Sequence, residues 1–510
     1  MKQDFSAIRN ALPSPVFDEH PEFIDLYWKA WDLAWDHVKE IPGMPQSPYM
    51  DEGFCDTDIW IWDTCFMALY CKYAPVELYP GYPSLKNFYS VIHDNGQLPE
   101  IIAQNVPIDG PIKVGEKARI RIHIADNPPL FAWAEYENAK ISGNIAHIKE
   151  LLLEKCYLQK HYDFLENLRA GSAIPGVKVK TYWEKDELGY HWEGGVSGMD
   201  NTPRGRAGAT SEKARPATGE LLWIDAICQQ AMSANIIGKL FRLLGEDDQA
   251  KIWEDRFAEK RQLIRSCYWD EENKFFFDLN GRAGDFCRVK TIGSYWTLTS
   301  HTASKNQAEA MVKHLEDPAE FGGDIPLVSL SRSDGDFNAE NGMYWRGSLW
   351  LPTAYATLKG CSNYGYHEIA RKNTLKLLNH MYRTWQEYSP HTIWECYAPC
   401  APEPGRSCDE NNRIVREDFC GWSAVGPIAA FIEFAIGLYD IDAITGEVKW
   451  SLPENITGKT GVKNLRFGDV TADLIADNEF ISVTSNRAFT LEVNGKTLNI
   501  QPGNNQFPRN

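Results

Sequence analysis

The sequence predicts a mainly α-helical protein that ends in a small β-rich segment. Two observations lead to this prediction. Apolar residues recur at helical spacing in about a dozen stretches, which alternate with loops rather than with strands. Near Lys449 this spacing gives way to short alternating stretches with a turn dipeptide. At 510 residues, 43% of them hydrophobic and 24% charged, the chain is long enough for a large core or for two domains.

The first half of the chain opens with residues 1–20, which we expect to be irregular because Pro13 and Pro15 interrupt them. Helical spacing of apolar and aromatic residues follows. The helices that we predict cover residues 21–41, 62–73 and 144–170, and another begins at the prolines of residues 127–133.

The second half contains further helices, predicted over residues 220–244, 246–268, 291–299, 303–315, 363–386 and 421–438. Residues 268–278 are predicted to form a short hairpin. Residues 205–217 are polar and poor in hydrophobic side chains, which is typical of a lid-like loop or of a surface insertion.

The C-terminal segment has the alternation of β-strands. Residues 479–485 and 488–493 are the predicted strands, and Asn494-Gly495 is a typical hairpin turn. We therefore expect a helical domain over residues 1–445 and a small β-rich appendage over residues 446–510.

The loop at residues 192–204 presents Asp200 among turn-forming residues. Gly198 allows a close backbone approach, and Pro203 stops any helix. Such a loop can place an acid at the rim of a cavity or, equally, cap a helix at the surface. Its sequence Ser-Gly-Met-Asp-Asn-Thr-Pro-Arg resembles the general-acid motif of inverting α-glycosidases of glycoside hydrolase family 63 and their trehalase and mannosylglycerate hydrolase relatives.

Further motifs match the same hydrolases. Trp62-Asp63-Thr-Cys-Phe resembles the motif that lines their sugar subsite, although an isolated Asp63 here would most often cap a helix. Residues 96–100 resemble the loop after the second helix of that family. Tyr344-Trp-Arg-Gly-Ser-Leu-Trp resembles another family segment, in which Arg346 would hold sugar hydroxyls or a carboxylate; on its own it would fit a structural ion pair.

The general base of the family lies in a Glu-x-Tyr-x-Pro segment, which Glu395 and the residues after it resemble. The Gly-Trp-Ser run at Trp422 resembles the family's end motif. The interval between these two motifs is longer than usual and contains Glu417, which is therefore a rival base.

The resemblance implies an (α/α)6 toroid whose helical domain is catalytic. It implies hydrolysis of an α-linked sugar, an α-glucoside di- or oligosaccharide, with inversion, and with Asp200 as acid and Glu395 as base. The implied substrate-binding residues are Trp62, Asp63, Asn201, Arg204, Tyr344, Trp345, Arg346 and Trp422. Many relatives carry a large β domain before the toroid that this chain lacks, so glucosylglycerate, mannosylglycerate or trehalose stays open as the substrate.

The composition limits the kinds of molecule that the protein is expected to bind and its expected location. The net charge of −18 argues against nucleic acid, while 18 Trp, 22 Tyr and 23 Phe offer faces on which sugars stack. No apolar stretch is long enough to span a bilayer. The N-terminus lacks the apolar core of a signal peptide, so we expect a cytoplasmic protein, or a periplasmic or secreted one if a leader was removed. The oligomeric state is not predicted.

The 12 cysteines do not predict a metal site. Cys396, Cys400, Cys408 and Cys420 lack the paired spacing of zinc ligands, so free thiols or one disulfide are expected. We expect no cofactor. Some relatives bind calcium, which leaves a structural calcium ion open, but no EF-hand loop is present.

Two other functions compete with hydrolysis. Sugar isomerases and epimerases on similar toroids use histidines, and of 12 here only His191 adjoins the central motif, with no spaced pair. A non-catalytic carbohydrate-binding protein would not need the two carboxylate motifs.

Overall fold

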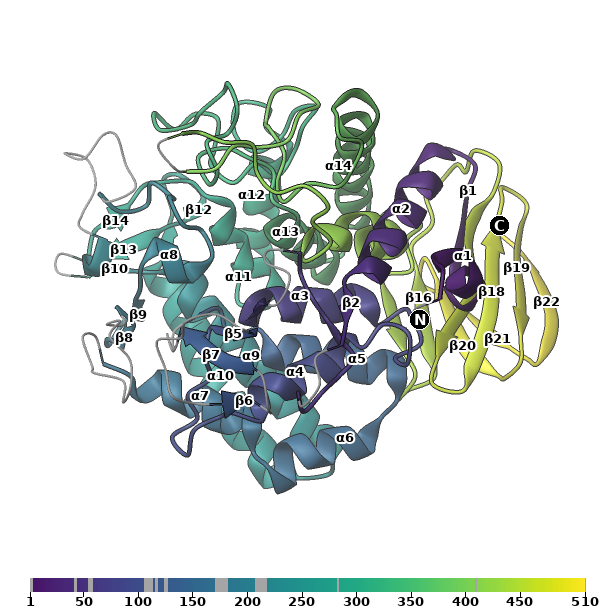
Figure 1. The fold of residues 1–510 in the computed structure, drawn as a ribbon, viewed down its shortest axis with the longest axis horizontal. Helices are drawn as coiled ribbons and strands as arrows, with labels where there is room; N and C mark the ends of the chain where they lie inside the picture. The colour runs from purple at the N-terminus through teal and green to yellow at the C-terminus, as the bar shows by residue number, and fades with distance from the viewer. Residues whose placement is uncertain are drawn as a thin grey trace.

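The computed structural model describes residues 3–40, 44–53, 58–104, 113–114, 118–122, 127–169, 182–206, 218–281, 284–408 and 411–509. Helices form the body of the molecule, and a β-rich region built largely from the C-terminal part lies beside it, close to both termini (Figure 1). No helix in these ranges is both long and apolar enough to cross a membrane.

The longer helices pack against one another in succession. Helix α3 (Ile61–Cys71) contacts α5 (Phe131–Ser142), which contacts α9 (Ile224–Leu243); α9 contacts α11 (Trp296–Thr299), and α11 contacts α13 (Leu351–Asn363). Both α13 and α3 contact the π-helix η7 (Gly426–Ala435). The other longer helices are α2 (Glu22–Asp36), α4 (Gly81–Tyr89), α7 (Tyr157–Asn167), α10 (Asp247–Cys267), α12 (Lys305–Glu316) and α14 (His367–Glu387). All of these except α12 flank the group, because each contacts at least one of its members.

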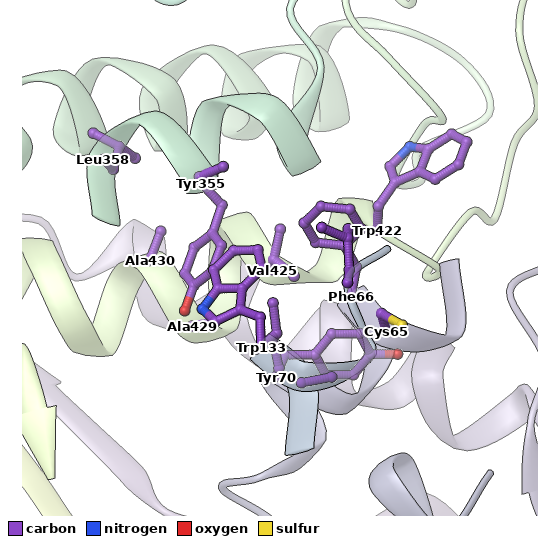
Figure 2. Packing of buried hydrophobic residues seen from close by; sticks show 14 of the residues in the cluster. Cys65, Phe66, Tyr70, Trp133, Tyr355, Leu358, Trp422, Val425, Ala429 and Ala430 are labelled. Carbon is purple, nitrogen blue, oxygen red and sulfur yellow. The ribbon is translucent and has the colours of Figure 1, made fainter. Parts of the chain in front are cut away.

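Burial separates the two kinds of helix. Every residue of α3 is buried, as expected for a helix that is apolar all round. In contrast, α10 buries few residues, among them Ala250, Trp253 and Ile264, and its charged face meets solvent. Figure 2 shows the centre of the core, where Phe66 of α3, Trp133 of α5 and Tyr355 of α13 meet. The ring of Trp133 lies 6.0 Å from each of the other two.

Several predicted helices differ in detail. The helix predicted over residues 144–170 is divided into α6 (Ile145–Lys149), a π-turn (Glu150–Glu154) and α7, because Cys156 takes a left-handed φ of 55°. The helix predicted over residues 421–438 is a 3-10 turn, η6 (Ser423–Val425), followed by η7. The polar loop predicted over residues 205–217 lies almost wholly outside the described residues.

The β-rich region consists of two sheets, ordered β1-β17-β18-β19-β22 and β15-β16-β20-β21. The strands are β1 (Ser14–Phe17), β15 (Asp440–Asp442), β16 (Glu447–Trp450), β17 (Thr460–Phe467), β18 (Val470–Ala476), β19 (Phe480–Ser485), β20 (Phe489–Val493), β21 (Lys496–Ile500) and β22 (Gly503–Pro508). The predicted hairpin is confirmed: Asn494 and Gly495 have φ values of 48° and 84° and join β20 to β21.

The expectation for residues 1–20 was wrong. They contain a helical turn, α1 (Phe5–Ile8), a 3-10 turn (Arg9–Ala11) and β1, which pairs with β17 at Pro15↔Val462. Pro15 is tolerated within β1 because this strand lies at the edge of its sheet, and Pro13 precedes the strand. The start of the chain is therefore part of the β-rich region.

Two further sheets, built from strands of two to five residues, were not predicted. One has the order β14-β13-β10-β9-β8 and the other β4-β5-β7-β6. The strands are β8 (Glu184–Lys185), β9 (Tyr190–His191), β10 (Leu221–Leu222), β13 (Asp278–Asn280), β14 (Phe286–Cys287), β4 (Asp58–Trp60), β5 (Ile101–Gln104), β6 (Lys113–Val114) and β7 (Ala118–Ile122). The predicted hairpin at residues 268–278 is confirmed by the pairing of β11 (Trp269–Asp270) with β12 (Phe275–Phe276).

Candidate active site

A cavity of about 210 Å³ opens at the N-terminal ends of α3 and α13. Its walls combine indole rings with carboxyl groups. The lining includes Trp62, Asp63, Glu100, Asp200, Tyr344, Trp345, Trp350 and Trp422. No histidine occurs among the described residues that line it. Flat apolar faces beside carboxylates are suited to a sugar ring with its hydroxyl groups.

Helix α8 (Gly194–Ser197) leads into the Asp200 loop. The Glu193 side chain caps this helix by accepting hydrogen bonds from the N–H groups of Gly195 and Val196, at 3.1 and 3.2 Å. Gly198 then ends the helix with a φ of 79°. A Cβ atom there would lie 2.6 Å from the Trp62 ring, so the close approach expected of this glycine is real.

Asp200 lines the cavity. It counts as an exposed residue because its side chain borders this open space. Burial raises the pKa of its carboxyl to about 7, and the negative charges of Glu395 and Glu193 contribute to the rise. Since the carboxyl faces open space rather than packed side chains, we expect the full rise when a substrate excludes water from the cavity. A carboxyl of this kind can hold a proton near neutral pH.

Glu395 is 3% exposed, and hydrogen bonds fix both its carboxylate and its backbone carbonyl. Its Oε1 accepts a hydrogen bond of 2.6 Å from the Tyr344 hydroxyl, and its Oε2 accepts one of 3.2 Å from the Arg416 N–H. The indole N–H of Trp422 donates to its backbone carbonyl at 2.8 Å. Burial raises the pKa of Glu395, while the bonds from Tyr344 and Arg416 lower it. The hydrogen bonds expected for an ionised base are present, but burial outweighs them.

The rival base occupies a different environment. Glu417 is exposed and is not among the residues that line the cavity. Glu395 is not a lining residue either, but it accepts a hydrogen bond from Tyr344, which is, and its charge acts on both Asp200 and Asp63.

Asp63 is a buried carboxyl in the first turn of α3, but it is not the N-cap, which is Trp60. Its Oδ2 has no hydrogen-bond partner in the described structure. Burial raises its pKa well above the usual range, and the charges of Glu395, Glu100 and Asp200 add to this rise. Glu100 was not predicted as a site residue, although it ends the loop of residues 96–100 that matched the family.

Arg204 does not reach the cavity, which corrects its expected role in substrate binding. It is fully buried, and its guanidinium donates to both carboxylates of Asp225 and Asp278 at 2.6–2.9 Å. It also stacks on the Trp223 ring at 4.1 Å. Its donors are therefore used to fix the end of the Asp200 loop.

Asn201 also has a different role from the one expected. Its side-chain N–H donates to the Met343 carbonyl and its Oδ1 accepts from the Trp345 N–H, both at 2.8 Å. Both polar ends thus bind backbone rather than facing the cavity. Trp345 lies in the cavity wall, whereas Arg346, the residue after it, is not part of the lining.

A larger cavity of about 400 Å³ lies at the other, C-terminal ends of α5, α9 and α13. Its lysines are largely paired with acids: Lys359 lies 2.9 Å from Glu433, and Lys140 forms an ion pair with Asp440. Cations also suit the negative ends of helix dipoles. Ion pairs and helix ends therefore account for the charged residues of this larger cavity without a ligand. We place the candidate active site in the smaller cavity.

The described ranges hold no group of three or more His, Cys, Asp or Glu side chains placed to bind a metal ion. Cys396 and Cys420 are buried thiols and Cys400 is an exposed one. His191, the histidine beside the central motif, contacts the Leu221 carbonyl and Asp186 and not the cavity lining.

Two curated relatives differ in how much of their length they share with this chain. An uncharacterized protein of Borreliella burgdorferi is 24% identical over 446 residues, which are 85% of this chain and 83% of that protein. The mannosyl-oligosaccharide glucosidase of Saccharomyces cerevisiae is 25% identical over 301 residues, covering 52% of this chain and only 33% of that enzyme.

Solved structures with a similar fold include a mannosylglycerate hydrolase of glycoside hydrolase family 63 from Thermus thermophilus, in complex with glucose. Its TM-score is 0.57 at 17% identity, over 80% of this chain and 99% of that one. A sialidase structure has a TM-score of 0.68 at 12% identity and covers 99% of this chain but 40% of its own. At these identities the likeness concerns the fold alone.

The sequence itself matches the model of one family over most of its length. Residues 57–409 match the "mannosylglycerate hydrolase MGH1-like glycoside hydrolase domain", and they include Asp63, Asp200, Tyr344 and Glu395. The chain therefore belongs to the MGH1-like glycoside hydrolases, and its resemblance to glycoside hydrolase family 63 is confirmed.

Proposed function

We propose that the protein hydrolyses an α-linked glucoside, a di- or oligosaccharide, with inversion at the anomeric carbon. The observation that carries the proposal is a pair of carboxyls: Asp200, which lines the aromatic cavity and has a pKa of about 7, and Glu395, which is hydrogen-bonded to the cavity residue Tyr344 and whose charge acts on Asp200. Glycoside hydrolysis needs one carboxyl to give a proton and another to take one.

In this proposal protonated Asp200 donates its proton to the glycosidic oxygen as the bond to the anomeric carbon breaks. Glu395 takes a proton from the water that attacks the opposite face of the sugar. Burial is the main cause of the raised pKa of Asp200, and the negative charge on Glu395 adds to it, so the base helps to keep the acid protonated. Tyr344 and the Arg416 N–H hold the Glu395 carboxylate in place.

Sugar binding is assigned to the rings and acids of the cavity wall. Trp62 and Trp422, whose ring centroids lie 5.4 Å apart, offer apolar faces to a pyranose. Asp63, whose Oδ2 has no hydrogen-bond partner in the described structure, forms hydrogen bonds with sugar hydroxyls. No cofactor is needed for this chemistry.

We further propose that the helices form an (α/α)6 toroid with the active site at one end. The succession of contacts from α3 through α5, α9, α11 and α13 to η7 and back to α3 supports this arrangement. The flanking helices would then form the outer layer.

A second candidate keeps the mechanism but changes the leaving group to glycerate. The match to the MGH1-like family model favours this candidate. Trehalose is the third compound that the motifs leave open.

The test is a substrate panel. Purified protein is incubated with α-linked glucose disaccharides, trehalose, glucosylglycerate and mannosylglycerate, and kcat/KM is measured for each. We expect one class to be preferred by a large factor. If the protein hydrolysed none of these compounds, the proposed substrate classes would be contradicted.

A further inference from the structure

The side chain of Asn201 holds the backbone on both sides of Tyr344. Its bonds go to the Met343 carbonyl and the Trp345 N–H, both at 2.8 Å. These groups belong to the two peptide units that flank Tyr344. A single amide thus fixes the orientation of both peptide planes around that residue.

Tyr344 requires such a hold because its backbone is left-handed. Its φ is 66°, and that of Met343 is 34°. Bulky side chains rarely adopt this region, and they keep it only where the surroundings impose it. Trp350 adds a second hold, because its indole N–H donates to the Tyr344 carbonyl at 3.1 Å.

The conformation of Tyr344 determines where its hydroxyl lies. That hydroxyl donates to the Glu395 carboxylate at 2.6 Å. Asn201 directly follows Asp200 in the chain, so contacts run from the proposed acid's loop through Asn201 and Tyr344 to the proposed base. The two carboxyls lie far apart in the sequence, yet this short chain of contacts connects them.

We propose that Asn201 is a positioning residue that orients the general base through Tyr344 and thereby ties the acid loop and the base into one unit. The proposal rests on the proposed glycosidase function. It assigns Asn201 no contact with the sugar.

The test compares Asn201→Ala, Tyr344→Phe and the double variant in kcat and KM as a function of pH. We expect each single variant to lose kcat on the order of 100-fold with little change in KM. Loss of the Tyr344 bond, which lowers the pKa of Glu395, should move the acid limb of the profile to higher pH. The double variant should lose no more than Tyr344→Phe alone, because both changes remove the same connection.

Asn338→Ala is the matched control. It removes an asparagine side chain from the same segment, where its Oδ1 accepts from the Asn341 N–H at 3.0 Å. Since that bond does not involve Tyr344, the acid limb should stay in place. The proposal would be overturned if the kcat losses of the two single variants multiplied in the double variant. It would also be overturned if Asn201→Ala raised KM and left the acid limb of the pH profile in place.

A second readout does not depend on activity. Amide hydrogen exchange of residues 342–347 in the intact protein should be faster in Asn201→Ala than in wild type or Asn338→Ala, because the Trp345 N–H loses its acceptor. Should the wild-type protein hydrolyse no glycoside, the proposed function fails, but exchange still decides the connection. Faster exchange supports it, and unchanged exchange overturns it.

Discussion

Arg204 provides a prediction that separates a structural role from a substrate-binding one. Arg204→Met removes a guanidinium that makes four hydrogen bonds of 2.6–2.9 Å to two buried carboxylates. Removing one partner of a buried ion pair typically costs about 3–5 kcal/mol, because the remaining charge is left uncompensated. Here Asp225 and Asp278, both at most 2% exposed, lose their shared cation. We therefore expect a loss of about 3–5 kcal/mol in the free energy of unfolding.

Urea unfolding followed by tryptophan fluorescence measures this loss as a lower midpoint. Arg242→Met is the matched control, since Arg242 also pairs with two acids, Asp247 and Glu254, but is exposed to water. Its midpoint should stay close to that of wild type. Arg204→Lys keeps the positive charge but lacks the planar guanidinium group. Its unfolding midpoint should therefore lie between those of Arg204→Met and wild type. An unchanged midpoint for Arg204→Met together with a raised KM would refute the structural role and restore Arg204 to the substrate site.

The other predictions concern catalysis directly. Asp200→Asn should lower kcat by about 10²–10⁴-fold on substrates with poor leaving groups. In wild type the alkaline limb of kcat should lie near pH 7, because the substrate complex needs the protonated form of an acid whose pKa is about 7; a limb more than about two pH units higher would contradict this assignment. Glu395→Gln should be inactive and Glu417→Gln active, and the reverse result would make Glu417 the base. Gly198→Ala should lower kcat/KM on the order of 100-fold, because its Cβ would lie 2.6 Å from a cavity tryptophan, whereas Gly245→Ala, at a similar φ of 77° in open space, should not.

The helices and the C-terminal strands were largely predictable because their periodicity is local. The spacing of Phe23, Leu26 and Tyr27 in α2 reflects one buried face, and all three are buried. Asn494-Gly495 predicted its turn because few residue pairs accept two positive φ values. In contrast, the sheets of two- to five-residue strands carry too few residues for an alternation to be visible.

Residue roles at the site were harder to predict than its location. The motif around Asp200 is rich in polar and turn-forming residues, and nothing local distinguishes a side chain that faces a cavity from one that faces buried carboxylates. The partners of Arg204 lie 21 and 74 residues away, and those of Asn201 lie 142 and 144 residues away. Only the tertiary structure brings them together.

The stereochemistry of the first product tests the central claim most directly. Proton NMR during hydrolysis of the preferred α-linked substrate identifies the anomer released before mutarotation. The account predicts that the β-anomer of the sugar appears first, because water activated by Glu395 attacks opposite to the bond that Asp200 protonates. Early appearance of the α-anomer would mean retention of configuration and would contradict the assignment of Asp200 and Glu395 as an inverting pair.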